Sequence, residues 1–255
     1  MLTGKGMSFG GSRVRTEATG YGTIFFADAM FHRIGQDFEG KRVGISGSGN
    51  VALFAAQKAK MLGATVVSMS DSSGFVVDET GIDLELLKQV KLIDRGRISD
   101  YAEARGSSAK FISGGRIWDV PVDVALTCAT QNELHERDAV TLLRNGVRLV
   151  AEGANMPTTP AAVRVFQDSG VLFGPGKAAN AGGVATSALE MQQNASRDSW
   201  SFEFTEQRLS EIMTNIHERV SVVAEDYGQP GNYVLGANIA GFSLVADAMH
   251  ALGVV

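Results

Sequence analysis

The sequence predicts an α/β fold, in which a doubly wound, mostly parallel sheet is followed by a helical C-terminal extension. Up to Phe173, short apolar runs alternate with segments whose apolar residues recur at helical spacing. This alternation is typical of βαβ units, which build a parallel sheet with helices on its faces. After Phe173 only helical patterns remain. We therefore expect one domain with added C-terminal helices, which no linker or internal repeat divides.

The alternation can be followed from the N-terminus. Gly35 and Gly63 end the first two helical patterns, as glycine often does at helix C-termini. The expected strands lie at residues 41–46, 65–70, 122–128, 147–151 and 171–173. The expected helices lie at residues 16–34, 51–62, 83–94, 136–144, 160–168, 180–196, 205–227 and 239–252. Among the remaining residues, the segment 102–117 shows no regular pattern.

The composition is that of an ordinary globular protein. Hydrophobic residues make up 44% and charged residues 20% of the 255 residues. No apolar run reaches the roughly 18–20 residues that span a bilayer. Residues 1–6 lack the apolar segment of a signal peptide. The single cysteine, Cys128, fits a reducing cytosol, so we expect a cytoplasmic protein with no membrane partner.

The charged and metal-binding residue types argue against two further classes of protein. A formal net charge of −5 gives no support to a nucleic-acid partner, which would favour a basic patch. The four histidines are scattered and form neither an HExxH motif nor a Cys/His cluster. We therefore expect no metal site.

A glycine-rich turn joins the strand at 41–46 to the helix at 51–62. Its sequence, GSGNVA at residues 47–52, is a G-x-G-x-x-A motif. In such a motif Gly47 permits the tight turn, Gly49 lets the backbone approach a pyrophosphate, and Ala52 lets the helix pack on the sheet. The free N–H groups of the helix start then meet the phosphates. The alternative is a purely structural turn, but the flanking strand and helix favour a Rossmann-like dinucleotide site.

An acid at the end of the second strand bears on the choice of dinucleotide. Asp71 lies 24 residues after Gly47, close to the roughly 20 expected for a carboxylate that binds the ribose of NAD. Taken alone it favours NAD, because it would repel the 2′-phosphate of NADP. Ser72 and Ser73 follow it, and Lys91, Arg95 and Arg97 lie on a segment that could fold back over the adenosine. The alternative is that these basic residues form a solvated helix face.

Polar motifs follow the later strands, at the carboxyl edge where ligands bind in doubly wound sheets. They are CATQNEL at residues 128–134, EGANMP at 152–157 and GPGKAANAGGVATS at 174–187. With RTEATGYG at 15–22, these four motifs resemble hexameric bacterial glutamate dehydrogenases of the NADP-dependent type, over essentially the whole chain. A single Asn or Thr at a strand end would more simply cap a turn, but several on successive strand ends favour a site.

The resemblance implies a role for each motif. Gly47, Ser48, Gly49, Asn50 and Val51 would hold the pyrophosphate of the cofactor. Thr130, Asn132 and Asn155 would line the nicotinamide ribose, with Arg15 and Thr19 closing over the nicotinamide. Further cofactor contacts would come from Ala129, Gln131 and Asn180.

The resemblance also bears on the 2′-phosphate and on the substrate. The family combines an acid such as Asp71 with a following serine and distant basic residues, here Ser72, Lys91 and Arg97. NADP is therefore the expected cofactor, with NAD as the alternative. Val184 and Ser187 would reach the substrate, Ser187 towards the side-chain carboxylate of glutamate.

The family's catalytic lysine and aspartate belong to an N-terminal domain, and no matching motif occurs here. We therefore expect no catalytic residue in this chain. Residues 1–255 would be the dinucleotide-binding domain, with a core at about 36–180 flanked by an N-terminal helix and the C-terminal helices. This domain would bind NADP(H) without converting L-glutamate to 2-oxoglutarate and ammonia. The homo-hexamer of the full-length enzyme would form largely through the absent catalytic domain.

Two alternatives remain at this stage. Leucine, phenylalanine and valine dehydrogenases share the architecture and usually take NAD, although the run GPGKAAN at residues 174–180 favours glutamate. The chain could also be a nucleotide-binding module with no catalysis of its own.

Overall fold

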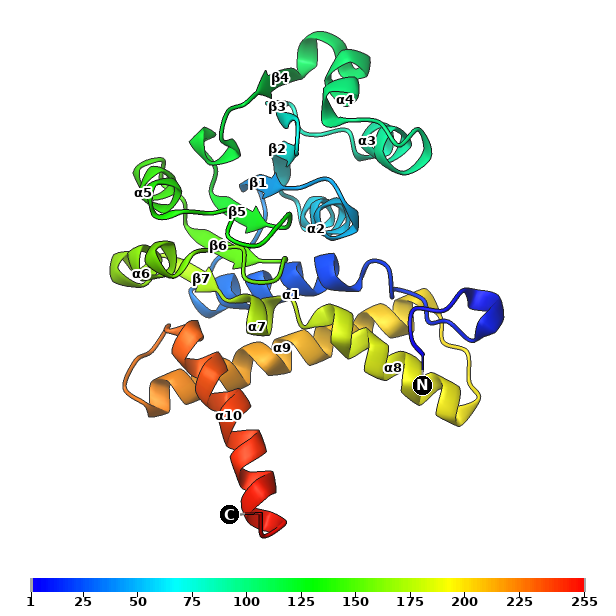
Figure 1. The fold of residues 1–255 in the computed structure, drawn as a ribbon, viewed down its shortest axis with the longest axis vertical. Coiled ribbons are helices and arrows are strands. Elements are labelled where there is room, and N and C mark those ends of the chain that lie inside the picture. The colour runs from blue at the N-terminus through cyan, green and yellow to red at the C-terminus, as the bar shows by residue number, and fades with distance from the viewer. Residues whose placement is uncertain (1, 255) are drawn as a thin grey trace.

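The computed structural model describes residues 2–254 and contains a seven-stranded sheet in the order β4-β3-β2-β1-β5-β6-β7 (Figure 1). β1 pairs in parallel with β2 and β5, and β6 pairs in parallel with β5 and β7. β3 is antiparallel to both β2 and β4. The strands are β1 (Arg42–Ser46), β2 (Thr65–Asp71), β3 (Gly74–Val77), β4 (Lys110–Ser113), β5 (Val124–Thr127), β6 (Leu149–Glu152) and β7 (Leu172–Gly174). The predicted mostly parallel α/β sheet is confirmed.

Each helix expected from the periodicity is present, and two further helices, Ile98–Arg105 and Gly176–Ala179, are not among those expected. They are α1 (Ala18–Arg33), α2 (Asn50–Met61), α3 (Leu84–Lys88), α4 (Ile98–Arg105), α5 (Glu136–Arg144), α6 (Pro160–Ser169), α7 (Gly176–Ala179), α8 (Gly182–Ser196), α9 (Phe202–Asp226) and α10 (Tyr233–Ala251). A π-helical turn, Gln89–Ile93, continues α3. The helix expected at 180–196 is preceded by the short α7, which begins directly after Pro175.

The sequence pattern does not predict the two strands at one edge of the sheet, β3 and β4. The segment 102–117, expected to be irregular, contains the end of α4 and all of β4, and β3 lies in the polar stretch after β2. β3 is a hairpin partner of β2, since Asp71 pairs with Gly74 across Ser72 and Ser73. Both missed strands have four residues. Strands this short have too few positions for an alternation to be recognised, and sheet pairing determines them.

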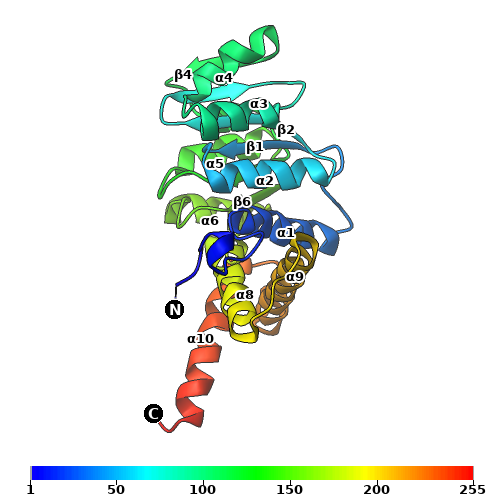
Figure 2. The same ribbon diagram turned by 90° about the vertical axis from the view of Figure 1, so that its right-hand side faces the viewer.

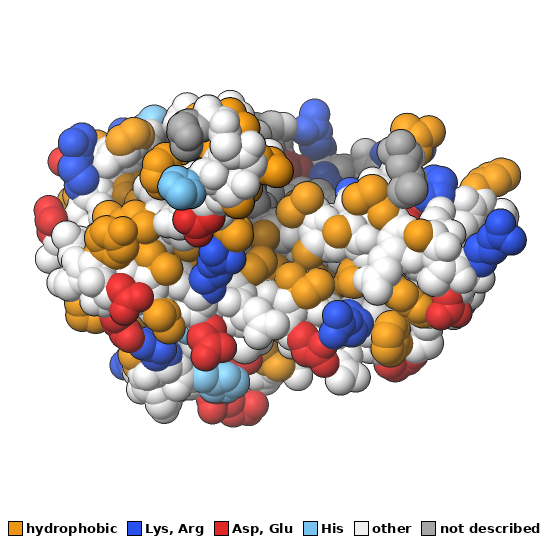
Figure 3. Space-filling model, turned by 90° about the horizontal axis from the view of Figure 1, so that it is seen from below, with side chains coloured by type: hydrophobic (Ala, Val, Ile, Leu, Met, Phe, Trp, Pro, Cys, Tyr) orange, Lys and Arg blue, Asp and Glu red, His pale blue; other side chains and the backbone are white. Residues whose placement is uncertain are grey.

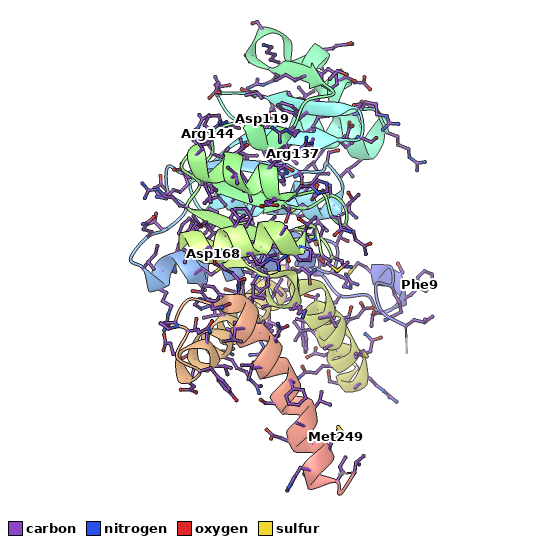
Figure 4. The ribbon with its side chains drawn as sticks, turned by 60° about the vertical axis from the view of Figure 1, so that its left-hand side comes forward. Phe9, Asp119, Arg137, Arg144, Asp168 and Met249 are labelled. Atoms are coloured by element: carbon purple, nitrogen blue, oxygen red, sulfur yellow. The ribbon has the colours of Figure 1, made fainter. Side chains whose placement is uncertain are left out.

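Helices cover both faces of the sheet (Figure 2). Successive strand residues point to alternate faces. Val124 and Leu126 of β5 pack in the cluster that includes α1, α2 and α3, whereas Ala125 packs in the cluster that includes α5 and α6. β6 repeats this pattern with Leu149 and Ala151 against Val150. On the outer side of α5 and α6, Arg137, Arg144 and Asp168 are exposed (Figure 4). The sheet is therefore buried on both faces, as in other parallel sheets.

α1 lies between the sheet and the C-terminal helices, and two of its glycines make this possible (Figure 1). A Cβ atom at Gly20 would lie 2.6 Å from the carbonyl oxygen of Val51 in α2. A Cβ atom at Gly22 would lie 2.7 Å from the Cα atom of Gly182 at the start of α8. Both separations are below what real Cβ atoms show. The glycines of α1 therefore set how closely α2 and α8 approach it.

α10 leaves the end of α9 and extends away from the sheet (Figures 1 and 2). Its buried residues are Tyr233, Gly236 and Ala240, all in the half next to the body. Phe242, Leu244 and Val245 are exposed, and hydrophobic side chains lie among charged ones over this underside of the molecule (Figure 3). By length and composition α10 could cross a membrane, contrary to the expectation that no segment is long and apolar enough to do so. One such helix is weak evidence of a membrane protein.

The contact at Gly20 yields a test of the packing. Gly20→Ala should destabilise the protein by about 1–3 kcal/mol, because the added methyl group meets backbone atoms of α2. The matched control is Gly241→Ala in α10, where a Cβ atom would meet nothing within 4 Å. That change should be neutral or stabilising by up to about 1 kcal/mol, as alanine is the better helix former. Urea unfolding measures both, and a Gly20→Ala variant as stable as the control would contradict this packing.

Candidate functional site

The carboxyl ends of four neighbouring parallel strands lie at one edge of the sheet. Ser46 at the end of β1 pairs with Thr127 of β5, and Thr127 pairs with Glu152 of β6. Gly174 of β7 pairs with Ala151. The loop that follows each strand therefore begins from the same edge, where doubly wound sheets bind ligands.

These loops, α1 and α8 line an open cavity of about 910 Å³. Most of the residues expected near the nicotinamide, and both expected substrate residues, line it. The predicted residues brought together here are Arg15, Thr19, Val51, Ala129, Thr130, Gln131, Asn155, Asn180, Val184 and Ser187. Their convergence from five separate segments of the chain depends on the tertiary structure.

Asn132 departs from this group. It lies outside the cavity and lines a separate, mostly apolar one between α6, β7 and α10. Its backbone has a φ of 55°, and its N–H donates to the carbonyl oxygen of Met156 at 3.0 Å. Asn132 thus lines a different cavity from Thr130 and Asn155, with which the resemblance groups it.

The glycine turn has the geometry that the motif predicts. Gly47 has a φ of 88° and donates its N–H to Ser70 Oγ at 2.9 Å, which joins the ends of β1 and β2. A Cβ atom at Gly47 would lie 3.0 Å from the carbonyl oxygen of Cys128, whereas one at Gly49 would meet nothing within 4 Å. Among residues 2–254 no side chain caps the start of α2, which leaves its first N–H groups available to an anion. Ala52 is completely buried.

Asp71, at the end of β2, is surrounded by hydrogen-bond donors. Its Oδ1 accepts from the N–H of Ser73 at 2.8 Å and the hydroxyl of Ser73 at 2.5 Å. Its Oδ2 accepts from the N–H of Ile98 at 2.9 Å and from Lys91 Nζ at 3.3 Å. Burial by itself would raise the pKa of Asp71, but these bonds together lower it. A carboxylate has about four lone-pair positions, so this one has little acceptor capacity left.

The basic residues expected near Asp71 are in place around it. Lys91 also donates to the carbonyl oxygen of Gly96 at 2.8 Å and is largely buried. Arg97 Nη1 donates to Ser72 Oγ at 2.8 Å, and Arg97 is exposed. Asp71 and Ser72 line a second cavity of about 300 Å³. The segment after α3 thus folds back over the end of β2. The solvated-face alternative is wrong for Lys91, whereas Arg95 and Arg97 are exposed.

Glu133 has a place in this edge that the sequence did not indicate. Its Oε1 accepts from the hydroxyl of Ser46 at 2.7 Å and from the N–H of Ala129 at 3.2 Å. The Ser46 hydroxyl in turn accepts from the N–H of Cys128 at 2.9 Å. Burial raises the pKa of Glu133, while these donors and the N–H of Thr130 lower it. The side chain therefore ties the loop that carries Thr130 to the end of β1.

The wall opposite the strand ends comes from α8 and from the segment before α1. Val184 is 71% exposed, and Ser187 donates its hydroxyl to the carbonyl oxygen of Gly183 at 3.1 Å. Arg15 lines the cavity, and its Nε is buried with no hydrogen-bond partner among residues 2–254. A buried donor without an acceptor is unusual in a folded protein, and a bound ligand can supply the missing acceptor.

Comparisons with known proteins agree with this arrangement. The family described as Glutamate/Leucine/Phenylalanine/Valine dehydrogenase matches residues 10–253. The NADP-specific glutamate dehydrogenase of Escherichia coli (strain K12) is 55% identical over 258 residues, which cover 100% of this chain and 57% of that protein. The NAD(P)-specific glutamate dehydrogenase of Xylanibacter ruminicola is 50% identical, with the same coverage of both chains.

The solved structures of glutamate dehydrogenases have the same fold. That of Plasmodium falciparum superimposes with a TM-score of 0.96 at 41% identity, covering 98% of this chain and 54% of the other. This chain thus spans little more than half the length of the relatives it matches. From the match over nearly all of its residues, the chain belongs to the glutamate/leucine/phenylalanine/valine dehydrogenase family.

Proposed function

We propose that this chain is the coenzyme-binding domain of an NADP-dependent glutamate dehydrogenase. The intact enzyme would convert L-glutamate to 2-oxoglutarate and ammonia, with NADP as hydride acceptor, and catalyse the reverse reaction. The observation that carries the NADP assignment is the environment of Asp71, which is hydrogen-bonded at both oxygens and ion-paired with Lys91. Three relatives that are 50–55% identical to this chain are named NADP-specific glutamate dehydrogenases.

The environment of Asp71 favours a 2′-phosphate over a free 2′-hydroxyl. An acid at this position selects NAD by accepting a hydrogen bond from the ribose 2′-hydroxyl. Asp71 has little capacity to accept that bond, because its lone pairs are already occupied. Lys91 at 3.3 Å also offsets its negative charge, so the repulsion of a phosphate is smaller. Arg97 and Ser72 present a guanidinium and a hydroxyl at the same place. Both groups suit a phosphate oxygen.

The rest of the coenzyme would extend from this point along the sheet edge. The free N–H groups at the start of α2 suit the pyrophosphate. The cavity bounded by Thr130, Asn155 and Asn180 suits the nicotinamide half, and the unpartnered Nε of Arg15 supplies a donor on its other side. Bound there, NADP would supply the site that accepts the hydride. The protein side chains would orient it and exclude water.

The substrate side of this cavity would be completed by residues outside the chain. Val184 and Ser187 present a small apolar and a hydroxyl group near the start of α8, which suits one end of a dicarboxylate such as glutamate. Within the described residues no lysine or carboxylate lines this cavity. Lys177, the lysine nearest in sequence to Val184 and Ser187, donates its Nζ to Asn238 Oδ1 at 2.5 Å. We therefore assign no catalytic residue to this chain and expect coenzyme binding without turnover.

The remaining assignments concern the intact protein. We propose that it acts in the cytoplasm, that an N-terminal catalytic domain supplies its proton-transfer groups, and that the subunits form a homo-hexamer largely through that domain. An NAD-dependent leucine, phenylalanine or valine dehydrogenase and a non-catalytic nucleotide-binding module are the competing functions. Cofactor preference and turnover distinguish them.

The cofactor assignment is tested by calorimetric titration of the purified chain with NADPH and NADH. We expect NADPH to bind at least tenfold more tightly. Lys91→Ala and Arg97→Ala should each weaken NADPH binding by about tenfold, because each removes a charged partner of the phosphate, and should leave NADH binding nearly unchanged. The control Arg144→Ala removes the same charge from the exposed end of α5 and should alter neither affinity. Tighter binding of NADH than NADPH would refute the assignment.

Turnover gives an independent test. The chain alone should show no glutamate-dependent reduction of NADP above background, at a concentration where NADPH binding is saturated. The reason is that the cavity lacks a lysine or carboxylate for general acid–base catalysis. Addition of the missing half of a relative should restore activity if the two parts assemble. Measurable activity of the chain alone would show that its own residues suffice for the reaction.

A further inference from the structure

Glu152, the last residue of β6, is a buried carboxylate with no cationic partner. It is 6% exposed, and it takes part in none of the ion pairs formed within residues 2–254. Its Oε2 accepts from the N–H of Gly176 at 2.6 Å, and its Oε1 accepts from the N–H of Thr158 at 3.2 Å. Burial raises the pKa of Glu152 and outweighs the hydrogen bonds from these two N–H groups, which lower it. Burying a carboxylate away from water costs free energy, and the hydrogen bonds that Glu152 accepts offset part of that cost.

The two N–H groups belong to the two segments that carry Asn155 and Asn180. Thr158 ends the loop that follows β6, and Asn155 lies in the middle of that loop. Gly176 is the first residue of α7, and Asn180 is the residue directly after this helix. Glu152 therefore fixes the far end of one segment and the near end of the other.

Asn180 closes the connection between the segments at the cavity wall. Its Nδ2 donates to Asn155 Oδ1 at 2.9 Å and to the carbonyl oxygen of Ala154 at 3.2 Å. The contacts thus form a ring, from Glu152 through α7 to Asn180, across to Asn155, and back through Thr158. A Cβ atom at Gly176 would lie 3.2 Å from Glu152 Oε2, which is tighter than most real Cβ contacts, so a side chain at that position would have to displace part of the ring.

We propose that Glu152 is a positioning residue, which sets Asn155 and Asn180 at the wall of the nicotinamide half of the cavity. The inference rests on the coenzyme function proposed above and adds a residue that does not itself line that cavity. A carboxylate suits this role because both of its oxygens accept, so it holds two converging N–H groups at once. A glutamine has one oxygen, and its amide group would place a donor against an N–H.

Two ligands separate this role from a general contribution to folding. In the proposed binding mode the nicotinamide half of NADPH would reach Asn155, whereas adenosine 2′,5′-bisphosphate would end at the adenosine side near Ser72 and Arg97. Calorimetry of Glu152→Gln should show NADPH binding weakened about tenfold, since one hydrogen bond to a charged acceptor is lost. The affinity for adenosine 2′,5′-bisphosphate should stay within twofold of wild type. Glu103→Gln, at an exposed position in α4, is the matched control and should change neither affinity.

A second variant interrupts the same ring without altering the buried acid. Asn180→Ala removes the link to Asn155 and also a side chain at the cavity wall, so the double variant rather than the single one tests the ring. In the double variant Glu152→Gln/Asn180→Ala the losses should be clearly less than multiplicative, because both changes release the same segment. If Glu152→Gln does not fold, as judged by thermal melting, Gly176→Ala tests the ring instead, because its added Cβ atom would lie 3.2 Å from Glu152 Oε2 and Gly176 does not line the cavity.

The outcomes separate the inference from the function on which it rests. Unchanged NADPH affinity in folded Glu152→Gln, or in Gly176→Ala where Glu152→Gln does not fold, would overturn the positioning role, as would fully multiplicative losses in the double variant. Equal weakening of both ligands would also overturn it, in favour of general structural support. If the wild-type chain binds neither ligand, the proposed coenzyme function fails instead.

Discussion

Because β1, β5, β6 and β7 are hydrogen-bonded in parallel, their carboxyl ends are adjacent, and every loop that forms the candidate site starts from this one edge. The register places Ser46, Thr127 and Glu152 side by side across the sheet. The glycine turn and the later polar motifs, far apart in sequence, become neighbours through this pairing. A one-residue slip in any of these strands would turn its alternating residues to the wrong face.

The acids at this edge show two ways in which a protein accommodates a carboxylate away from water. Asp71 accepts from four donors, one of which is the Lys91 cation at 3.3 Å, and its pKa is lowered. Glu133 and Glu152 lack a cation within the described residues, accept N–H and hydroxyl groups, and have raised pKa values because burial dominates. The first arrangement adjusts charge at a surface where a phosphate is proposed to bind. The other two hold backbone, and so determine where loop side chains lie.

The helices beneath the sheet complete the cavity through close packing. Gly22 of α1 lets Gly182 approach, which brings the start of α8 to the wall opposite the strand ends. α9 packs against both helices of this pair, while the C-terminal half of α10 is largely exposed and carries apolar side chains. The cavity thus depends on helix contacts as much as on the sheet.

The sequence by itself determined the elements whose signal is local. The glycine turn, the helix α2 after it and the buried strands are recognisable because backbone conformation and apolar periodicity are properties of a short window. Tertiary structure decided the rest. β3 forms through pairing with β2 and β4 through pairing with β3, and Lys91 and Arg97 meet Asp71 and Ser72 only after the chain folds back. Asn132 and Thr130 line different cavities. Glu133 and Glu152 stand inside motifs that are visible in the sequence, but their partners are N–H and hydroxyl groups. Those partners follow no pattern of residue types, because every residue except proline carries the same N–H, and only the fold decides which of them converge on a carboxylate.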